Sequence, residues 1–224
     1  MSDDLALDES TQSAPTTPAS PPLSTLKTPN PRRVRVAHYV SIILSPITVS
    51  LPFVFLVALY HAQSILTAFL YAFVVLFFLS FGPTVYVLVG VRVGKFTDSD
   101  VSVRSQRVGP FLFGISSALV GLATLFFIHG PKNLQTLLLI TIVSGGVMMI
   151  VTLWWKISIH ASSLAAAATV LTALYGSILL PLFVFLVAVC WSRVVLRRHT
   201  LGQVIAGSLV SVVLTSLILA IRGV

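Results

Sequence analysis

Four residues in the last quarter of the chain combine side chains that can handle a phosphate group: Ser192, Arg193, His199 and Gln203. A neutral imidazole is a competent nucleophile toward phosphorus, and the planar guanidinium fork matches phosphate oxygens. His199 and Gln203 stand four residues apart, so in a helix the glutamine carbonyl can accept a hydrogen bond from the ring. The amide carries no charge to stabilise an imidazolium. The pattern predicts phosphoryl transfer through His199; the competing interpretation is a histidine that only lies at a membrane interface.

A second polar group, Lys156, Ser158 and His160, precedes an alanine-rich run from Ala161 to Ala168. A histidine at this border can protonate a leaving alkoxide as a general acid. The amides at the start of the following helix, together with the Ser158 hydroxyl, can hold phosphate oxygens. The small residues allow close helix packing. Here too the alternative is a residue at the edge of a span.

A third polar segment supplies the cations Lys95, Arg104 and Arg107 together with Asp98 and Asp100. The acids can pair with arginines. Two acids without a nearby histidine or a third acid make a poor metal-ligand set, so we expect no metal and no cofactor. The alternative to a phosphate-binding role is a solvated loop.

Composition indicates an integral membrane protein. The 224 residues are 56% hydrophobic and 9% charged, with a mean hydropathy of +1.01, whereas soluble domains carry about 25% charged residues. The formal charge is +8, but the basic residues lie at the ends of apolar segments, which excludes a nucleic-acid-binding face. No acidic residue follows Asp100, which excludes paired-carboxylate hydrolysis and carboxylate relays in the later spans.

The sequence divides into two parts. Residues 1–33 are rich in Ser, Thr and Pro, which predicts a disordered cytoplasmic tail, and residues 34–224 form the membrane domain. The uncharged stretch 160–192 is too long for one span, so we read it as a hairpin that turns at Tyr175-Gly176-Ser177; one long kinked helix is the alternative. We expect an all-α bundle of about seven spans, with six as the alternative. The apolar segments are 38–60, 65–91, 110–129, 133–153, 160–176, 178–192 and 203–221.

Lysine and arginine predict the orientation. With seven spans, twelve basic residues fall on the N-terminal side and two, Lys132 and Arg222, on the other, which places the N-terminus in the cytoplasm. The same parity places the loops after the second, fourth and sixth spans on one side. The three polar groups can therefore converge on one cytoplasmic surface, and we expect a bacterial-type cell membrane.

Together, these groups resemble the type 2 phosphatidic acid phosphatase and vanadium haloperoxidase superfamily. Its pattern is Lys-x6-Arg-Pro, then Pro-Ser-Gly-His, then Ser-Arg-x5-His-x3-Asp. The third element is present as Ser192, Arg193 and His199, with Gln203 in place of the aspartate. The second element survives as Ser158-Ile159-His160, with Ile157 in the place of the proline.

The first element of the family pattern is the most changed. Arg107 stands for its arginine, and the proline comes late, at Pro110. Asp100 takes the place of the lysine, and Arg104 or Lys95 is a candidate for the missing cation.

The resemblance implies a helical membrane core and a phosphatase or phosphotransferase acting on a lipid phosphate such as phosphatidate or a polyprenyl phosphate. It implies His199 as the nucleophile and His160 as the general acid. The residues expected around the phosphate, or orienting His199, are Arg193, Arg107, Arg104, Ser158, Lys95 and Gln203. The alternative is a catalytically degenerate member that binds lipid or serves as a scaffold. A transporter or channel is disfavoured by the lack of acids within the spans.

Overall fold

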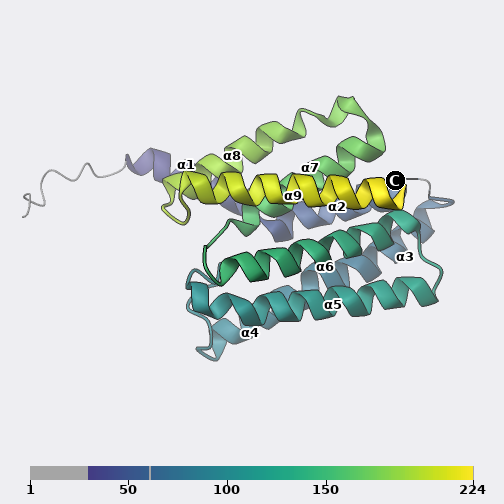
Figure 1. Cartoon of the computed structure of the whole chain (residues 1–224), viewed down its shortest axis with the longest axis horizontal. Coiled ribbons are helices and arrows are strands. Elements are labelled where there is room, and N and C mark those ends of the chain that lie inside the picture. The colour runs from purple at the N-terminus through teal and green to yellow at the C-terminus, as the bar shows by residue number, and fades with distance from the viewer. Residues whose placement is uncertain (1–29, 61, 224) are drawn as a thin grey trace, which may run out of the picture. The chain divides into compact units, whose positions relative to one another are not determined.

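The computed structural model describes residues 30–60 and 62–223, and within these ranges the chain is helical with no β-strand. This confirms the expected all-α class. Figure 1 shows the helices running roughly alongside one another as a bundle. The α-helices are α1 (Pro31–Ile43), α2 (Pro46–Leu59), α3 (Ile65–Leu76), α4 (Gly82–Arg92), α5 (Val108–Phe127), α6 (Lys132–Thr152), α7 (Ile159–Tyr175), α8 (Leu182–Val195) and α9 (Leu201–Arg222).

The outer surface of this bundle is apolar, as a lipid-facing surface must be. Large hydrophobic side chains stand 69–79% exposed on several helices, among them Leu66, Phe73, Phe126 and Ile178. A water-soluble monomer rarely exposes so much contiguous apolar surface. Within residues 30–60 and 62–223, five helical segments are long and apolar enough to cross a membrane. The chain is therefore an integral membrane protein.

The described residues contain at most six candidate membrane spans, which agrees with the alternative of six and not with the expected seven. The first segment is not one straight helix, because Ser45 caps a new helix that opens with Pro46, and α1 and α2 meet at a bend of 40°. Counting that bent pair as one span gives six, and α7 is a shorter apolar helix. α1 also begins at Pro31, so three residues assigned to the tail, 31–33, are helical. The rest of the tail assignment lies outside the described residues.

The uncharged stretch forms the predicted hairpin. α7 ends at Tyr175, and Gly176 turns the chain with φ +85°, a conformation that glycine adopts without steric cost. A short 3₁₀ turn, η4 (Ser177–Leu179), leads into α8. The alternative of one long kinked helix is wrong.

The second span contains a widened turn. Between α3 and α4 the chain forms a π-helical turn, η2 (Phe77–Phe81), and such turns leave backbone groups that need other partners. One partner comes from α5, where the Ser117 hydroxyl donates to the Phe78 carbonyl at 2.7 Å. Another neighbour comes from α2, where the Ser50 and Ser80 hydroxyl oxygens lie 3.0 Å apart. Both contacts hold the widened turn against the bundle.

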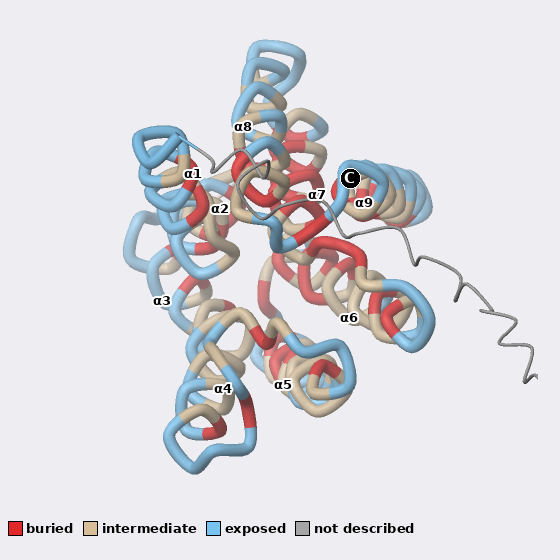
Figure 2. Tube along the Cα trace, turned by 90° about the vertical axis from the view of Figure 1, so that its left-hand side faces the viewer, coloured by how far each residue is buried: buried red, intermediate tan, exposed pale blue. Residues whose placement is uncertain are grey.

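Among the described helices, α7 and α9 share the most extensive contact. Figure 2 shows the buried residues concentrated on α7 and on the inward faces of its neighbours. Gly207 of α9 allows this approach, because a Cβ there would lie 2.8 Å from the Ser158 carbonyl oxygen. The Ser158 amide in turn donates to the Gln203 carbonyl at 3.3 Å. This contact fixes α7, which carries His160, to α9, which begins two residues after His199.

Replacing that glycine should loosen the contact. We expect Gly207→Ala to lower the free energy of unfolding by about 1–3 kcal/mol, because the added methyl group forces the backbones apart. Gly202→Ala is the matched control, since a Cβ there meets nothing closer than 3.6 Å. Thermal unfolding of the purified proteins in detergent measures both. Equal melting temperatures for the two variants would contradict this account of the packing.

Candidate functional site

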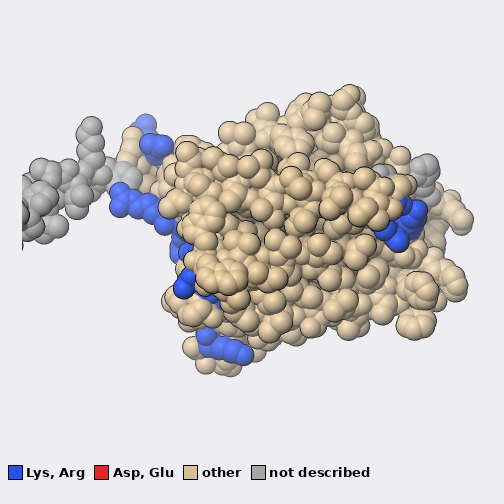
Figure 3. All heavy atoms as spheres, in the orientation of Figure 1, with Lys and Arg blue, Asp and Glu red and all other residues tan. Residues whose placement is uncertain are grey.

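Three loops meet at one end of the bundle. The sequence predicts this, because loops that follow the second, fourth and sixth spans lie on the same side of the membrane. They are residues 93–103, 153–158 and 196–200, and hydrogen bonds join them to one another and to the helix ends. Figure 3 shows Lys and Arg gathered at that end, with a smaller group at the opposite end. The end that carries these loops is the candidate site.

Arg193 lies at its centre. The side chain comes from the last turn of α8, and the residue is 3% exposed. One terminal nitrogen donates to Asp100 Oδ2 at 2.9 Å, and the other donates to Ser41 Oγ at 2.8 Å. The Nε atom is buried and has no hydrogen-bond partner among the described residues. A buried guanidinium N–H without an acceptor is costly, so this atom is ready for a phosphate oxygen.

Asp100 is held by its loop and by Arg193. Its backbone amide donates to the Asp98 side chain at 2.9 Å, which shapes the turn. Burial raises the pKa of the Asp100 carboxyl, but the attraction of Arg193 and of Arg198 outweighs this effect, so the pKa lies below its usual value. The carboxylate therefore stays ionised and occupies one edge of the guanidinium. The sequence pattern suggested that the acids pair with arginines, and they do: Asp98 lies 3.8 Å from Arg198.

Arg107 ties two of the loops together. It is 3% exposed, its Nε donates to the Val101 carbonyl at 3.0 Å, and one terminal nitrogen donates to the Ile157 carbonyl at 3.2 Å. Its remaining N–H groups lie in the same basic region as Arg193. The loop that carries Asp100 is thus held against the segment that leads into α7.

His199 is fixed in one tautomer. Its Nδ1 lies 3.3 Å from the Lys156 carbonyl oxygen and 3.3 Å from Gln203 Oε1. The Thr200 amide also donates to Oε1 at 3.1 Å, which identifies that atom as the amide oxygen. Both neighbours of Nδ1 are acceptors, so Nδ1 carries the proton and Nε2 keeps its lone pair. The ring is oriented by two neutral oxygens, the Lys156 carbonyl oxygen and Gln203 Oε1, which leaves Nε2 available.

His199 should remain neutral well below pH 6.5. Burial, followed by the charges of Arg107 and Arg193, lowers the pKa of His199 from 6.5 to about 4. The unfolded chain binds this proton first as the pH falls, so the stability contributed by the neutral ring is full above about pH 6.5 and is lost toward pH 4. NMR titration of histidine-labelled protein measures this pKa, with His199→Gln identifying the signal. A midpoint near 6.5 would contradict the buried, electropositive setting.

Ser158 and His160 stand at the start of α7. The Ser158 hydroxyl accepts from the Ala161 amide at 3.4 Å and so caps the helix, which leaves its own hydrogen for another acceptor. His160 is half-buried, and it is close enough to Asp100 to affect the pKa of that carboxyl. The structure therefore brings together Arg193, Arg107, Ser158, His160, His199 and Gln203.

Arg104 and Lys95 are engaged elsewhere. Arg104 is exposed and donates to the Leu153 and Trp154 carbonyls at 2.9 and 2.7 Å, where it caps the C-terminal end of α6. The Lys95 ammonium lies 3.4 Å from the Tyr86 hydroxyl and over the rings of Tyr86 and Phe96. Neither cation takes the place of the missing lysine.

Lys156 is a further cation of this end of the bundle. Burial, and then the charges of Arg107 and Arg193, lower the pKa of its ammonium. The sequence pattern named Arg104 and Lys95, not Lys156, as candidates for the missing cation. The position of Lys156, two residues before Ser158, is the feature of the sequence that could have identified it.

A comparison with protein families places this end of the molecule in a known context. The family model described as the PAP2 superfamily matches residues 153–223. That range contains Ser158, His160, Arg193 and His199, whereas Arg107 and Asp100 lie before it. Searches of curated proteins and of solved structures returned no significant match.

Proposed function

We propose that this chain, whose residues 153–223 match the PAP2 superfamily model, is an integral membrane phosphatase or phosphotransferase acting on a lipid phosphate such as phosphatidate or a polyprenyl phosphate. Members of that superfamily are generally phosphatases. One observation carries the proposal: His199 presents a free Nε2 lone pair in the same electropositive cluster as a buried guanidinium with an unpartnered N–H. The two groups supply a nucleophile and a phosphate-oxygen donor.

The reaction runs in two displacements. Phosphate oxygens bind Arg193, Arg107 and the Ser158 hydroxyl, which neutralises the charge that would repel the nucleophile. His199 Nε2 attacks phosphorus, and the bond from phosphorus to the lipid oxygen breaks while His160 gives that oxygen a proton. Water then attacks the phosphorus, the bond from phosphorus to His199 Nε2 breaks, and the water gives a proton to His160. The products are the lipid alcohol and inorganic phosphate; an acceptor alcohol in place of water gives phosphotransfer.

Asp100 competes with the substrate for Arg193. A phosphate that binds Nη2 as well as the unpartnered Nε must displace the carboxylate, so we expect Asp100→Asn to bind vanadate, a phosphate analogue, about tenfold more tightly than wild type. Asp98→Asn is the matched control, because it removes the same charge from the same loop without touching Arg193. Inhibition constants for vanadate measure the effect. Weaker binding in Asp100→Asn would mean that the carboxylate positions Arg193 rather than competing for it.

The site faces the cytoplasm in a bacterial-type cell membrane in this proposal. The support is the excess of Lys and Arg at the end of the bundle that carries the three loops. Cysteines introduced by Ser105→Cys and Asn133→Cys in a Cys190→Ser background test it with a membrane-impermeant maleimide. Labelling from outside at position 105 and protection at 133 would reverse the orientation.

The activity is tested by phosphate release from detergent-purified protein. The panel contains phosphatidate, lysophosphatidate and a polyprenyl phosphate, with and without vanadate. Turnover that vanadate blocks, together with acid-labile label retained on the protein from ³²P substrate, is the expected result. Absence of both release and labelled protein on every substrate would overturn the enzyme assignment.

The second candidate is a binding protein that keeps the phosphate site but has lost turnover. Two observations favour it. The neutral Gln203 side chain stands beside His199 where a carboxylate would stabilise the charged ring, and Asp100 already accepts a hydrogen bond from Arg193. Lipid phosphate that binds but is not hydrolysed, with turnover appearing in Gln203→Asp, would establish it.

A further inference from the structure

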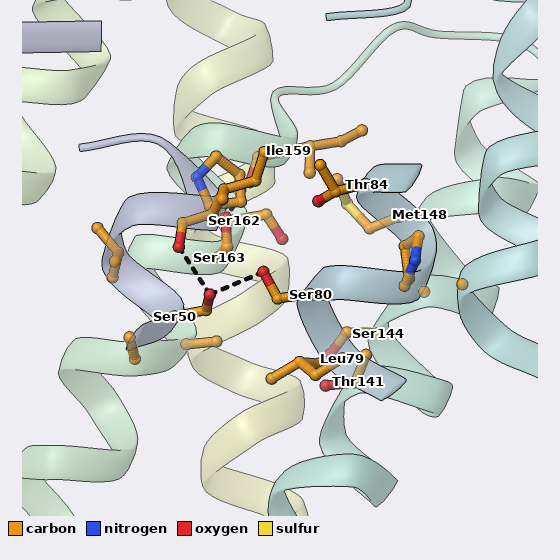
Figure 4. A pocket seen from close by; sticks show the side chains of 18 of the residues that line it. Ser50, Leu79, Ser80, Thr84, Thr141, Ser144, Met148, Ile159, Ser162 and Ser163 are labelled. Carbon is orange, nitrogen blue, oxygen red and sulfur yellow. Dashed lines mark hydrogen bonds between the residues drawn. The ribbon is translucent and has the colours of Figure 1, made fainter. Parts of the chain in front are cut away.

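A cavity of about 400 Å³ lies inside the bundle between α2, the η2–α4 segment, α5, α6 and α7. Ligand pockets generally measure about 300–1,000 Å³ and are mostly apolar. Figure 4 shows several hydroxyl-bearing side chains in its wall, including Ser50, Ser80 and Ser163. The first question is whether these groups seek a polar ligand.

The hydroxyls are largely occupied by the protein itself. Ser50 donates to the Ile47 carbonyl at 2.8 Å and also bonds Ser80. Ser163 donates to the Ile159 carbonyl at 2.6 Å, and Thr141 donates to a carbonyl one turn before it at 3.0 Å. Ser162 is bonded to Ser211. What the wall offers a ligand is therefore mostly carbon surface.

One end of the cavity adjoins the phosphate site. Ser99 and Ile159 line it there, and the residues that follow them in the chain are Asp100 and His160. Ile47 on α2 and Leu88 on α4 also line the cavity, and both are about half exposed. α4 packs on α5, whereas α2 packs on α3 and α7. The half-exposed Ile47 and Leu88 thus connect the cavity wall with the outer surface of the bundle.

We propose that this cavity holds one hydrocarbon chain of the phosphate substrate, which enters between α2 and α4 while its headgroup binds Arg193 and His199. The inference rests on the proposed function for its headgroup. On α7 the lining residues extend from Ile159 to Val170. At about 1.5 Å per residue this is about 16 Å, roughly half of a bilayer core of about 30 Å. The cavity therefore fits a single chain, acyl or prenyl, from one leaflet.

Two glycines make a matched pair of variants. A Cβ at Gly114 of α5, which lines the cavity, meets no atom within 4 Å, so Gly114→Leu would fill cavity space without a backbone clash. Gly146 of α6 is equally open but does not line the cavity. Gly146→Leu therefore controls for the loss of a glycine within a span.

The test is calorimetric titration of the full chain in nanodiscs with inorganic phosphate and with butyl, hexyl and octyl phosphate, after subtraction of titrations into empty nanodiscs. Affinity of the wild type should rise by up to about fourfold per methylene. Gly114→Leu should lose this rise for the longer chains, Gly146→Leu should keep it, and all three should bind inorganic phosphate equally. Geranyl phosphate, run in parallel, distinguishes a preference for prenyl chains from one for linear chains.

Affinity that does not depend on chain length, or equal losses in both leucine variants, would overturn the chain site. Hydrolysis is measured separately on the same preparations. Chain-dependent binding without hydrolysis refutes only the enzyme activity, whereas hydrolysis without chain dependence refutes only the cavity.

Discussion

His199→Ala is expected to slow phosphate release at least about a thousandfold, because no other group can form the phosphoenzyme. His160 is the other histidine of the cluster, and its place at the start of α7 suits proton transfer to the leaving oxygen. The variant should still fold, since the hydrogen-bonding partners of the His199 ring among the described residues are two neutral oxygens at 3.3 Å. Initial rates on the best lipid phosphate measure the loss.

The control for that experiment is His38→Ala, which removes an exposed histidine from α1. It should retain wild-type rates and wild-type thermal stability. Activity in His199→Ala within tenfold of the control would rule out a phosphohistidine and would move the nucleophile to water.

Arg193→Ala is expected to lower both activity and stability. Activity should fall about a thousandfold, because the substrate loses charge-assisted hydrogen bonds that strengthen in the transition state. The free energy of unfolding should fall by about 1–3 kcal/mol, because Asp100 and Ser41 lose their partner while the carboxylate remains partly buried. Rates and thermal unfolding in detergent measure the two effects. Arg92→Ala, an exposed arginine at the end of α4, is the control.

A second substitution separates the two effects of Arg193. The double variant Arg193→Ala with Asp100→Ala should recover part of the stability, since no unpaired carboxylate remains, but none of the activity. Recovery of activity in the double variant would show that Arg193 serves only to neutralise Asp100.

The sequence could predict that the three polar segments lie at the same end of the bundle, because this follows from the number of spans between them. The alternation of apolar segments placed the polar breaks after the second, fourth and sixth spans on one side, and hydrogen bonds such as that from Arg107 to Ile157 now join them. The hairpin at Gly176 followed from length and a turn signal, since an uncharged stretch of 33 residues exceeds the bilayer and Tyr175-Gly176-Ser177 offers a turn near its middle.

The individual partners could not be predicted in the same way. Arg193 and Asp100 are 93 positions apart, and nothing local distinguishes Asp100 from Asp98, which pairs with a different arginine. Arg104 has the charge and the loop position of a phosphate ligand, yet it binds carbonyls at the end of α6. Such choices depend on ångström-scale distances between loops. A sequence pattern identifies which residues share a surface, not which of them touch.

The π-helical turn Phe77–Phe81 sets the rotational register of everything after it in the second span. A helical residue advances the chain by about 100° around the axis, so removing one residue from this turn would swing α4 by that angle. Leu88 would then leave the gap beside α2, and the Phe78 carbonyl would return to the helix ladder and release Ser117. The position of Leu88 in the cavity wall therefore depends on the one additional residue that the π-helical turn accommodates.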